Sequence, residues 1–331
     1  MSTQMLAEDE RRIAQPLASA PVRIAPDGDL EAAISVLSLV KRFGTTTALD
    51  GLDLTVRSGE VHGFLGPNGA GKTTTVEILE GYRDRTSGNV SVLGQDPAKG
   101  AAELRRRIGI VLQSTGIDPF LTVRETIEMY AGYYPRRRPT DEVIEVVGLV
   151  EKRDVRVNKL SGGQQRRLDV AIAMAGDPEL LFLDEPTTGF DPGARRNAWE
   201  IVRNLSSMGK TVFLTTHYMD EAQNLANRVA VIAHGAIVAE GPPGSLAGRE
   251  RMKTRIRFRL PPGAPEPDRA SHRSPDGSYE ILADQEETTK RVHDLTAWAL
   301  ESGVVLDALE VTPPTLEDVY LELTASEDVT A

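Results

Sequence analysis

The feature that most constrains this chain is a glycine-rich loop between an apolar run and a helical pattern. The loop fits the pattern G-x-x-x-x-G-K-[ST]. The apolar run at 61–65 precedes it and favours a strand, and Val76 and Leu79 follow it at helical spacing. A strand, a glycine loop and a helix in this order are the context of a phosphate-binding loop. The loop and the start of the helix consist of Gly66, Pro67, Asn68, Gly69, Ala70, Gly71, Lys72, Thr73 and Thr74.

Each part of such a loop has a chemical reason. Glycines let backbone N–H groups approach phosphates without a Cβ in the way, and the following helix points its positive end at them. Lys72 can reach the β and γ oxygens as a point charge, and the Thr73 hydroxyl can ligate Mg²⁺. An ordinary glycine-rich turn with a surface lysine would need neither the strand nor the helix. The loop therefore predicts a site for ATP and Mg²⁺.

Two acids at the end of a second apolar run supply the other half of such a site. The run 180–183 suits a parallel strand that is buried on both faces, and Asp184 and Glu185 follow it directly. Open α/β sheets place ligands at the carboxyl ends of their strands. Asp184 suits the surroundings of Mg²⁺, and Glu185 can act as general base on the attacking water. Alone, the segment would fit a strand ending in solvated acids; beside the phosphate loop, it predicts hydrolysis.

The pentapeptide 160–164 is a third motif, and it indicates which class of ATP-using protein this site belongs to. With it, the chain resembles the ATP-binding subunits of ABC transporters over roughly residues 33–248, because the pentapeptide matches the family signature without a mismatch. The resemblance implies an α/β fold, a P-loop NTPase core with a helical subdomain at about 115–165. In the family, this subdomain carries the signature and docks on the membrane subunit.

Four further residues match the family in register. Phe43 lies where the family has an aromatic ring that stacks on adenine, although a packed core phenylalanine is the alternative. Gln113 follows an apolar run and matches the Q-loop residue that ligates Mg²⁺, although a lone glutamine would more often be a solvated loop residue. Asp191 ends the segment that resembles the D-loop. His217 follows another apolar run and matches the switch histidine that contacts the γ-phosphate.

The resemblance also implies that two chains share each site. In the family, the serine and the second glycine of the signature contact the γ-phosphate that the partner's phosphate loop holds. Two ATP molecules then lie in a head-to-tail dimer, for which a homodimer is the expectation, and hydrolysis weakens the interface. A serine hydroxyl and backbone donors at a helix start make chemical sense as an anion clamp. The signature residues expected at the nucleotide are Ser161, Gly162, Gly163 and Gln164.

Finer resemblance narrows the type of transporter. The segments 161–171, 186–192 and 313–323 look like those of the daunorubicin/doxorubicin-resistance group of ABC-2-type exporters. This implies an ATPase subunit that energises efflux of a drug, an antibiotic or a lipid-like molecule through a separate permease. The transported molecule itself is selected by the membrane subunit, so the sequence leaves it open.

Composition agrees with this interpretation. Lysine and arginine total 38 against 49 acids, a net charge of −11, which argues against a nonspecific nucleic-acid surface. The chain has no cysteine, which fits a reducing cytoplasm. No apolar run approaches the roughly 18 residues of a membrane span, and the polar start does not resemble a signal peptide. We therefore expect a peripheral protein at the cytoplasmic face of the membrane, with the pore on another polypeptide.

Composition also divides the chain into three parts. Residues 1–32 carry mixed charge, proline and alanine, and we expect them to be disordered. The ATP-binding domain covers 33–248, and the linker signal at 241–244 predicts that 249–331 folds semi-independently as a small α+β domain. In that domain, we expect a helix at 285–301 and a strand at 304–311.

Two segments of the accessory domain invite a choice. Arg255, Arg257 and Arg259 alternate with apolar residues and predict a strand with one wet face, which we favour over a lipid or nucleic-acid surface. The last predicted helix, 315–324, carries apolar residues on one face. Such a helix must bury that face, and we expect it to do so on its own small sheet or on a partner.

Two other classes of function remain to be weighed. A soluble ABC ATPase of translation or DNA repair is disfavoured, because translation types usually carry two cassettes and this chain has one. Repair types insert long coiled coils, for which the 89 residues from Lys72 to Ser161 leave no room. An importer ATPase with a regulatory domain is the other alternative; the segment 316–319 near the end of the tail favours the exporter.

Overall fold

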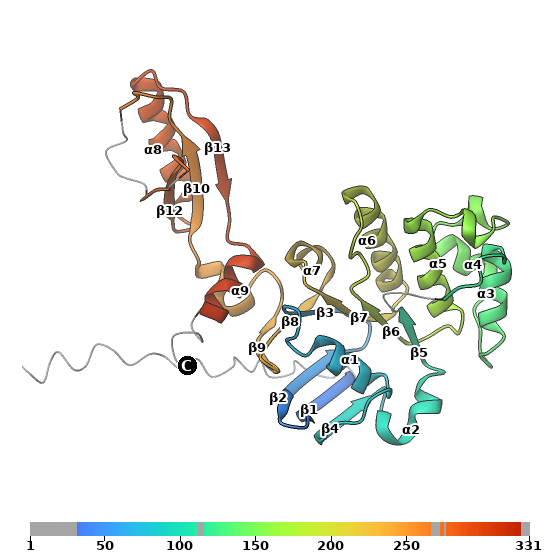
Figure 1. The fold of residues 1–331 in the computed structure, drawn as a ribbon. Helices are drawn as coiled ribbons and strands as arrows, with labels where there is room; N and C mark the ends of the chain where they lie inside the picture. Colours follow the sequence, from blue (N-terminus) through green and yellow to red (C-terminus); the bar gives the residue numbers. More distant parts are fainter. Residues whose placement is uncertain (1–31, 112–115, 266–271, 275, 326–331) are drawn as a thin grey trace, which may run out of the picture.

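The larger part of the molecule is built on a six-stranded sheet with the order β5-β6-β7-β3-β8-β9 (Figure 1). The first five strands are parallel, and β9 runs antiparallel to β8. The computed structural model describes residues 32–111, 116–265, 272–274 and 276–325. The strands of this sheet are β3 (Val61–Leu65), β5 (Ile108–Val111), β6 (Leu180–Asp184), β7 (Thr211–Thr216), β8 (Arg228–Ala233) and β9 (Ala236–Gly241).

A smaller antiparallel sheet, β2-β1-β4, covers one face of the large one. Buried side chains of both sheets, among them Leu54 and Phe182, share one core cluster with Leu79. The strand β1 begins at Ala32; the rest of the segment 1–32, for which we expect disorder, lies outside the described residues, as does Gln113. The elements on this side are β1 (Ala32–Phe43), β2 (Thr46–Arg57), β4 (Ser87–Val92), α1 (Lys72–Leu79) and α2 (Pro97–Leu104).

Helices cover the other face, and their apolar sides share a second cluster with the strands. Val123, Leu168 and Leu205 come from three of these helices and pack with Leu181 and Leu214 of the sheet. Within the described ranges, no helix is both long enough and apolar enough to cross a bilayer. These helices are α3 (Val123–Ala131), α4 (Thr140–Val146), α5 (Gly162–Met174), α6 (Pro192–Ser207) and α7 (Met219–Leu225).

The register of the central strands decides where the site lies. The parallel neighbours β6, β7 and β3 pair so that Asp184 lies beside Thr215 and Thr216 lies beside Leu65. The segments that follow these three strands therefore leave the sheet at one edge. They are the phosphate loop, Glu185 and His217, which the sequence predicts as parts of one site.

The accessory domain is a second antiparallel sheet, β11-β12-β10-β13, with the helix α8 packed on it (Figure 1). Its strand β10 alternates buried and exposed residues, as the sequence predicts. The arginines on the wet face are paired with acids: Arg255 with Glu280 at 3.3 Å, and Arg257 with Asp276 at 2.6 Å. The elements are β10 (Thr254–Arg259), β11 (His272–Arg273), β12 (Tyr279–Ala283), α8 (Thr288–Glu301) and β13 (Asp307–Thr312).

Two boundaries in this domain differ from the prediction. The helix α8 starts at Thr288, three residues later than the expected 285, and β13 starts at Asp307 rather than at 304. The N–H of Val304 donates to the carbonyl of Ala299 at 2.8 Å, and Gly303 has a φ of 64°. Val304 thus closes the end of the helix, and the strand begins only after this cap.

The last helix, α9 (Leu316–Ala325), is expected from the sequence to pack on the accessory sheet or on a partner, and it packs elsewhere. Leu316 and Val319 are buried in a cluster with Leu65, Val229 and Val231 of the large sheet. The helix therefore buries its apolar face on the ATPase core, not on the accessory sheet or on a partner. Sequence periodicity gives the apolar face of a helix but not the surface that receives it.

This packing makes a stability prediction. Leu316→Ala removes a side chain that is 2% exposed, so we expect the free energy of unfolding to fall by about 2–5 kcal/mol. Leu321→Ala is the control on the same helix, because Leu321 is 56% exposed and its loss is expected to change stability by about 0.5 kcal/mol or less. Denaturant titration of both full-length variants measures the difference. Equal stabilities would mean that α9 is not part of the folded core.

Candidate functional site

The phosphate loop holds its lysine in place with its own backbone carbonyls. The Nζ of Lys72 donates to the carbonyls of Gly66 at 2.7 Å and of Pro67 at 3.1 Å, and it lies 3.7 Å from Glu185 Oε1. Burial lowers the pKa of Lys72, while the charges of Glu185 and Asp184 raise it. The positive charge is therefore aimed at the mouth of the loop, where phosphates would bind.

Two glycines of the loop are required by their surroundings. A Cβ on Gly66 would lie 2.5 Å from the carbonyl oxygen of Ile232, on the neighbouring strand β8. Gly71 has a φ of 112°, and a Cβ there would lie 2.7 Å from Leu49. A side chain at Gly66 would force the backbone of β8 to move, and a side chain at Gly71 would displace the Leu49 side chain and hold a strained φ.

The carboxylate of Glu185 lies at the centre of a polar cluster. His217 Nδ1 is 3.2 Å from Glu185 Oε1, and the Thr188 hydroxyl donates to Oε2 at 3.1 Å. The backbone N–H of Glu185 donates to Thr215 at 3.1 Å, which anchors the residue to the end of β7. With Lys72 on the same carboxylate, the structure brings together the acid, the histidine and the lysine that the sequence predicts.

Glu185 has a shifted pKa and an unusual backbone conformation. Burial raises the pKa of Glu185, but His217, Thr188 and the charge of Lys72 lower it more, so its pKa lies below the ordinary value. The carboxylate is therefore ionised at neutral pH and can accept a proton. Its φ of 45° lies in the left-handed region, which costs a residue other than glycine about 1–3 kcal/mol. Sequence reasoning did not foresee this strain.

Asp184 and Thr73 fit a magnesium site of the kind used with nucleotides. Asp184 accepts a hydrogen bond from the Thr215 hydroxyl, and Thr73 is exposed at the start of α1. Mg²⁺ is usually held by one or two protein groups together with phosphate oxygens and water. A hydroxyl and a carboxylate beside the phosphate loop therefore match its preference for oxygen ligands.

Phe43 is on the surface, which disfavours its alternative role as a core residue. Its side chain is 43% exposed at the end of β1. Lys41 Nζ lies 4.9 Å from the ring centroid, and the guanidinium carbon of Arg83 lies 5.1 Å from it. An exposed ring beside cations can receive an adenine base by stacking.

The signature begins a helix, and its side chains cap that helix. Ser161 is the N-cap of α5: its hydroxyl accepts from the N–H of Gln164 at 3.3 Å, and Gln164 Oε1 accepts from the N–H of Ser161 at 2.9 Å. This is a capping box, so both side chains have a structural role besides the predicted one. Ser161 and Gly162 are exposed, which leaves the positive end of α5 open to an anion.

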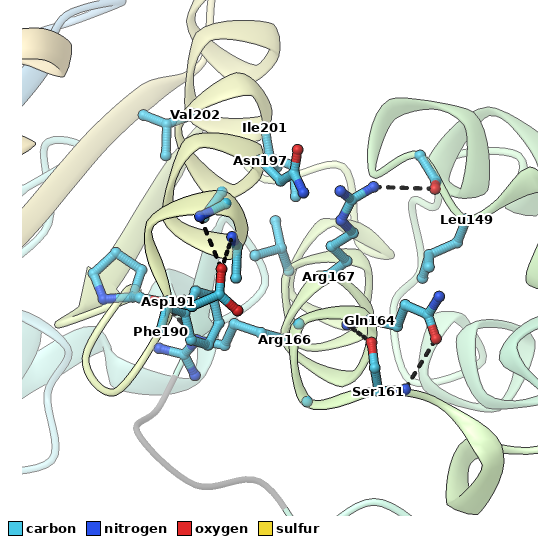
Figure 2. Close-up of a pocket in the computed structure, with 18 of the residues that line it drawn as sticks. Leu149, Ser161, Gln164, Arg166, Arg167, Phe190, Asp191, Asn197, Ile201 and Val202 are labelled. Carbon is cyan, nitrogen blue, oxygen red and sulfur yellow. Dashed lines mark hydrogen bonds between the residues drawn. The ribbon is translucent and has the colours of Figure 1, made fainter.

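The signature and the D-loop line one cavity of about 1020 Å³ (Figure 2). Asp191 reaches this cavity as the N-cap of α6, where it accepts from the N–H groups of Gly193 and Ala194 at 2.8 and 2.9 Å. None of the residues described as lining the cavity comes from the phosphate loop. Helices α1 and α5 also stand in different parts of the molecule (Figure 1). The phosphate loop and the start of the signature helix therefore lie apart in one chain.

Comparison with known proteins shows which family the chain resembles. The ABC transporter family model matches residues 49–188. Daunorubicin resistance ATP-binding protein DrrA2 of Streptomyces coeruleorubidus is 41% identical over 310 residues, which cover 88% of this chain and 95% of that protein. The chain belongs to the ABC transporter ATP-binding proteins. This ABC ATPase is also 42% identical to Nod factor export ATP-binding protein I of Burkholderia lata over 224 residues, 66% of this chain and 74% of that protein.

A solved structure agrees with the fold. A dimeric bacterial ABC transporter cassette has a TM-score of 0.54 and 26% identity, and the match covers 63% of this chain and 98% of that chain. The predicted α/β fold of an ABC ATPase core is therefore confirmed. The protein hydrolyses ATP as the energising subunit of an ABC exporter, and the importer and soluble ATPase alternatives are not supported by these relatives.

One residue of the ABC ATPase core escaped the sequence analysis. Arg166 of α5 donates to the backbone carbonyls of Asp184 and Pro186, both at 3.2 Å, and it pairs with Asp169 at 3.6 Å. It ties the signature helix to the segment around Glu185. Burial lowers the pKa of Arg166, and Asp169 counters the shift. The sequence held one signal for this role. It is a pair of opposite charges, Arg166 and Asp169, three residues apart on a helix that is largely buried.

Proposed function

We propose that this ABC ATPase powers the efflux of an antibiotic, a drug or a lipid-like molecule through a separate permease. The observation that carries the proposal is the match to a daunorubicin resistance protein, which extends over 88% of the chain. It thus reaches beyond the ATPase core into the accessory domain. An ATP-binding subunit that resembles a resistance protein over 88% of its length is best placed in an efflux system.

The geometry of the described residues supports a mechanism for the proposed hydrolysis, in which Gln113 takes part by resemblance alone. Lys72 binds the β- and γ-phosphates, and Glu185 accepts a proton from the attacking water. His217 contacts the γ-phosphate and lies against the base at 3.2 Å. Thr73 and Asp184, together with Gln113, would hold Mg²⁺, which neutralises phosphate charge when it is bound.

The proposed site is completed by a second copy of the chain. The signature and the phosphate loop lie apart in one chain and form two half-sites in this proposal, so a head-to-tail pair would bring each signature to the partner's nucleotide. The dimeric cassette among the structural matches supports such pairing. Ser161 and the N–H groups of Gly162 and Gly163 would then bind the γ-phosphate from the open end of α5.

The permease is proposed to dock beside the ends of α1 and α3, at the cytoplasmic face of the membrane. Tyr133 follows α3 and is 76% exposed, and Tyr82 follows α1 and is also exposed. Exposed aromatic residues are typical of an interface with another protein.

This docking surface makes a prediction. Tyr133→Ala, combined with Tyr82→Ala, is expected to reduce pull-down of the permease by roughly tenfold or more, because exposed aromatic residues are frequent interface anchors. Binding of a fluorescent ATP analogue should not change. Leu300→Ala is the control, since Leu300 is exposed on α8 of the accessory domain. Unchanged pull-down by the double variant would contradict this surface.

The proposed efflux is tested with the membrane protein encoded beside this chain. Both are expressed in a host that is sensitive to anthracyclines and other amphipathic antibiotics, and survival and intracellular drug are measured. Efflux predicts resistance that disappears with Lys72→Ala. Resistance that persists in this variant would contradict the proposal, as would a periplasmic-type binding protein in the adjacent reading frame, which supports import.

A further inference from the structure

Tyr218 lies in a row of ring and cation contacts that leads away from the site. Its ring centroid is 4.1 Å from that of His217, at an interplanar angle of 38°. Arg195 of α6 also contacts Tyr218, and its guanidinium carbon is 4.4 Å from the ring centroid. Since His217 Nδ1 is 3.2 Å from Glu185, a continuous row of contacts joins α6 to the carboxylate.

Beside these contacts, helix α6 is also joined to helix α7. Arg195 Nη1 donates to Asp220 at 3.1 Å, and Trp199 Nε1 donates to Glu221 at 3.2 Å. Glu221 is fully buried, and burial raises its pKa. The first turn of α7 is thus fixed to α6 at two points, one of which is inaccessible to water.

The guanidinium group of Arg195 lies over the ring of Tyr218. Its Nε is buried and has no hydrogen-bond partner among the described residues. A guanidinium that lies over an aromatic ring gains a cation–π interaction, which is stronger where water is excluded. The half-buried ring of Tyr218 contacts both this cation and the imidazole of His217, so we expect it to limit the orientations that the imidazole can adopt.

We propose that Tyr218 and Arg195 are positioning residues that hold His217 against Glu185 and make its position depend on helix α6. The N-cap of this helix is Asp191, which lines the cavity of the signature. A displacement of the D-loop would therefore move Arg195, and through Tyr218 the histidine. The inference rests on the proposed role of His217 at the γ-phosphate.

The first test uses full-length variants and steady-state ATP hydrolysis. Tyr218→Leu removes the ring and is expected to lower kcat by roughly tenfold with little change in KM, because ATP is still bound but the histidine is misplaced. Tyr218→Phe keeps the ring, so its kcat should stay within about twofold of that of the unsubstituted protein. Arg195→Met is expected to lower kcat by about threefold to thirtyfold. Arg196→Met, at an exposed neighbouring position, is the control.

A second test asks whether the effect passes through the histidine. In a His217→Ala background, Tyr218→Leu should cause no further loss of kcat, since the residue that it positions is gone. An equal loss in both backgrounds, or a Tyr218→Phe variant as slow as Tyr218→Leu, would overturn the inference. If His217→Ala alone leaves kcat unchanged, the proposed role of His217 fails instead, so the two failures are distinguishable.

Discussion

Replacing Glu185 by glutamine is expected to lower ATP turnover by about 10²-fold or more while ATP binding is kept. The amide has almost the same shape but cannot accept the proton of the attacking water. Its contacts with Thr188 and with the end of β7 can remain, because they use one side-chain oxygen and the backbone. The variant should accumulate as an ATP-bound dimer, which gel filtration with ATP detects.

A control separates loss of the base from a general effect of the substitution. Glu200→Gln makes the same chemical change at an exposed position of α6 and should hydrolyse ATP at the original rate. Circular dichroism should show that both variants are folded. If Glu185→Gln turns over ATP near the original rate, the assignment of the base is wrong.

The parts of the site that the sequence predicts are those with local causes. The phosphate loop is contiguous, and its chemistry follows from glycines, one lysine and one hydroxyl. The strands that end at Glu185 and His217 are short apolar runs, and parallel strands must release their carboxyl ends at one edge. The structure therefore places these residues together, with 3.2 Å between the histidine and the acid.

The parts that could not be predicted depend on contacts between distant segments. Arg166 bonds to carbonyls 18 and 20 residues further along the chain. Leu316 packs on strands of the core that lie more than 80 residues earlier. No periodicity encodes such pairings, because a helix pattern shows which side is apolar and not what covers it. The strained φ of Glu185 has the same origin in its surroundings.

The signature illustrates how one residue can carry a local and a distant role. Ser161 matches the family motif, yet within the chain its hydroxyl caps α5 together with Gln164. Loss of such a cap costs about 1 kcal/mol on its own. A test of the predicted contact with the partner's nucleotide must therefore separate binding in trans from stability of the helix. Thr122 offers the matched control, because it caps α3 with Glu125 in the same type of capping box.

Mixing two inactive variants is expected to restore ATP hydrolysis if the half-sites are shared between chains. Lys72→Ala loses the phosphate contacts of its own loop, and Ser161→Ala loses the clamp that it offers to a partner. Each variant alone should show a loss of about 10²-fold or more in turnover. A heterodimer has one intact composite site, so activity should return on mixing, whereas Thr122→Ala alone should stay active. Inactive mixtures in which heterodimers are demonstrated would mean that each chain closes its own site.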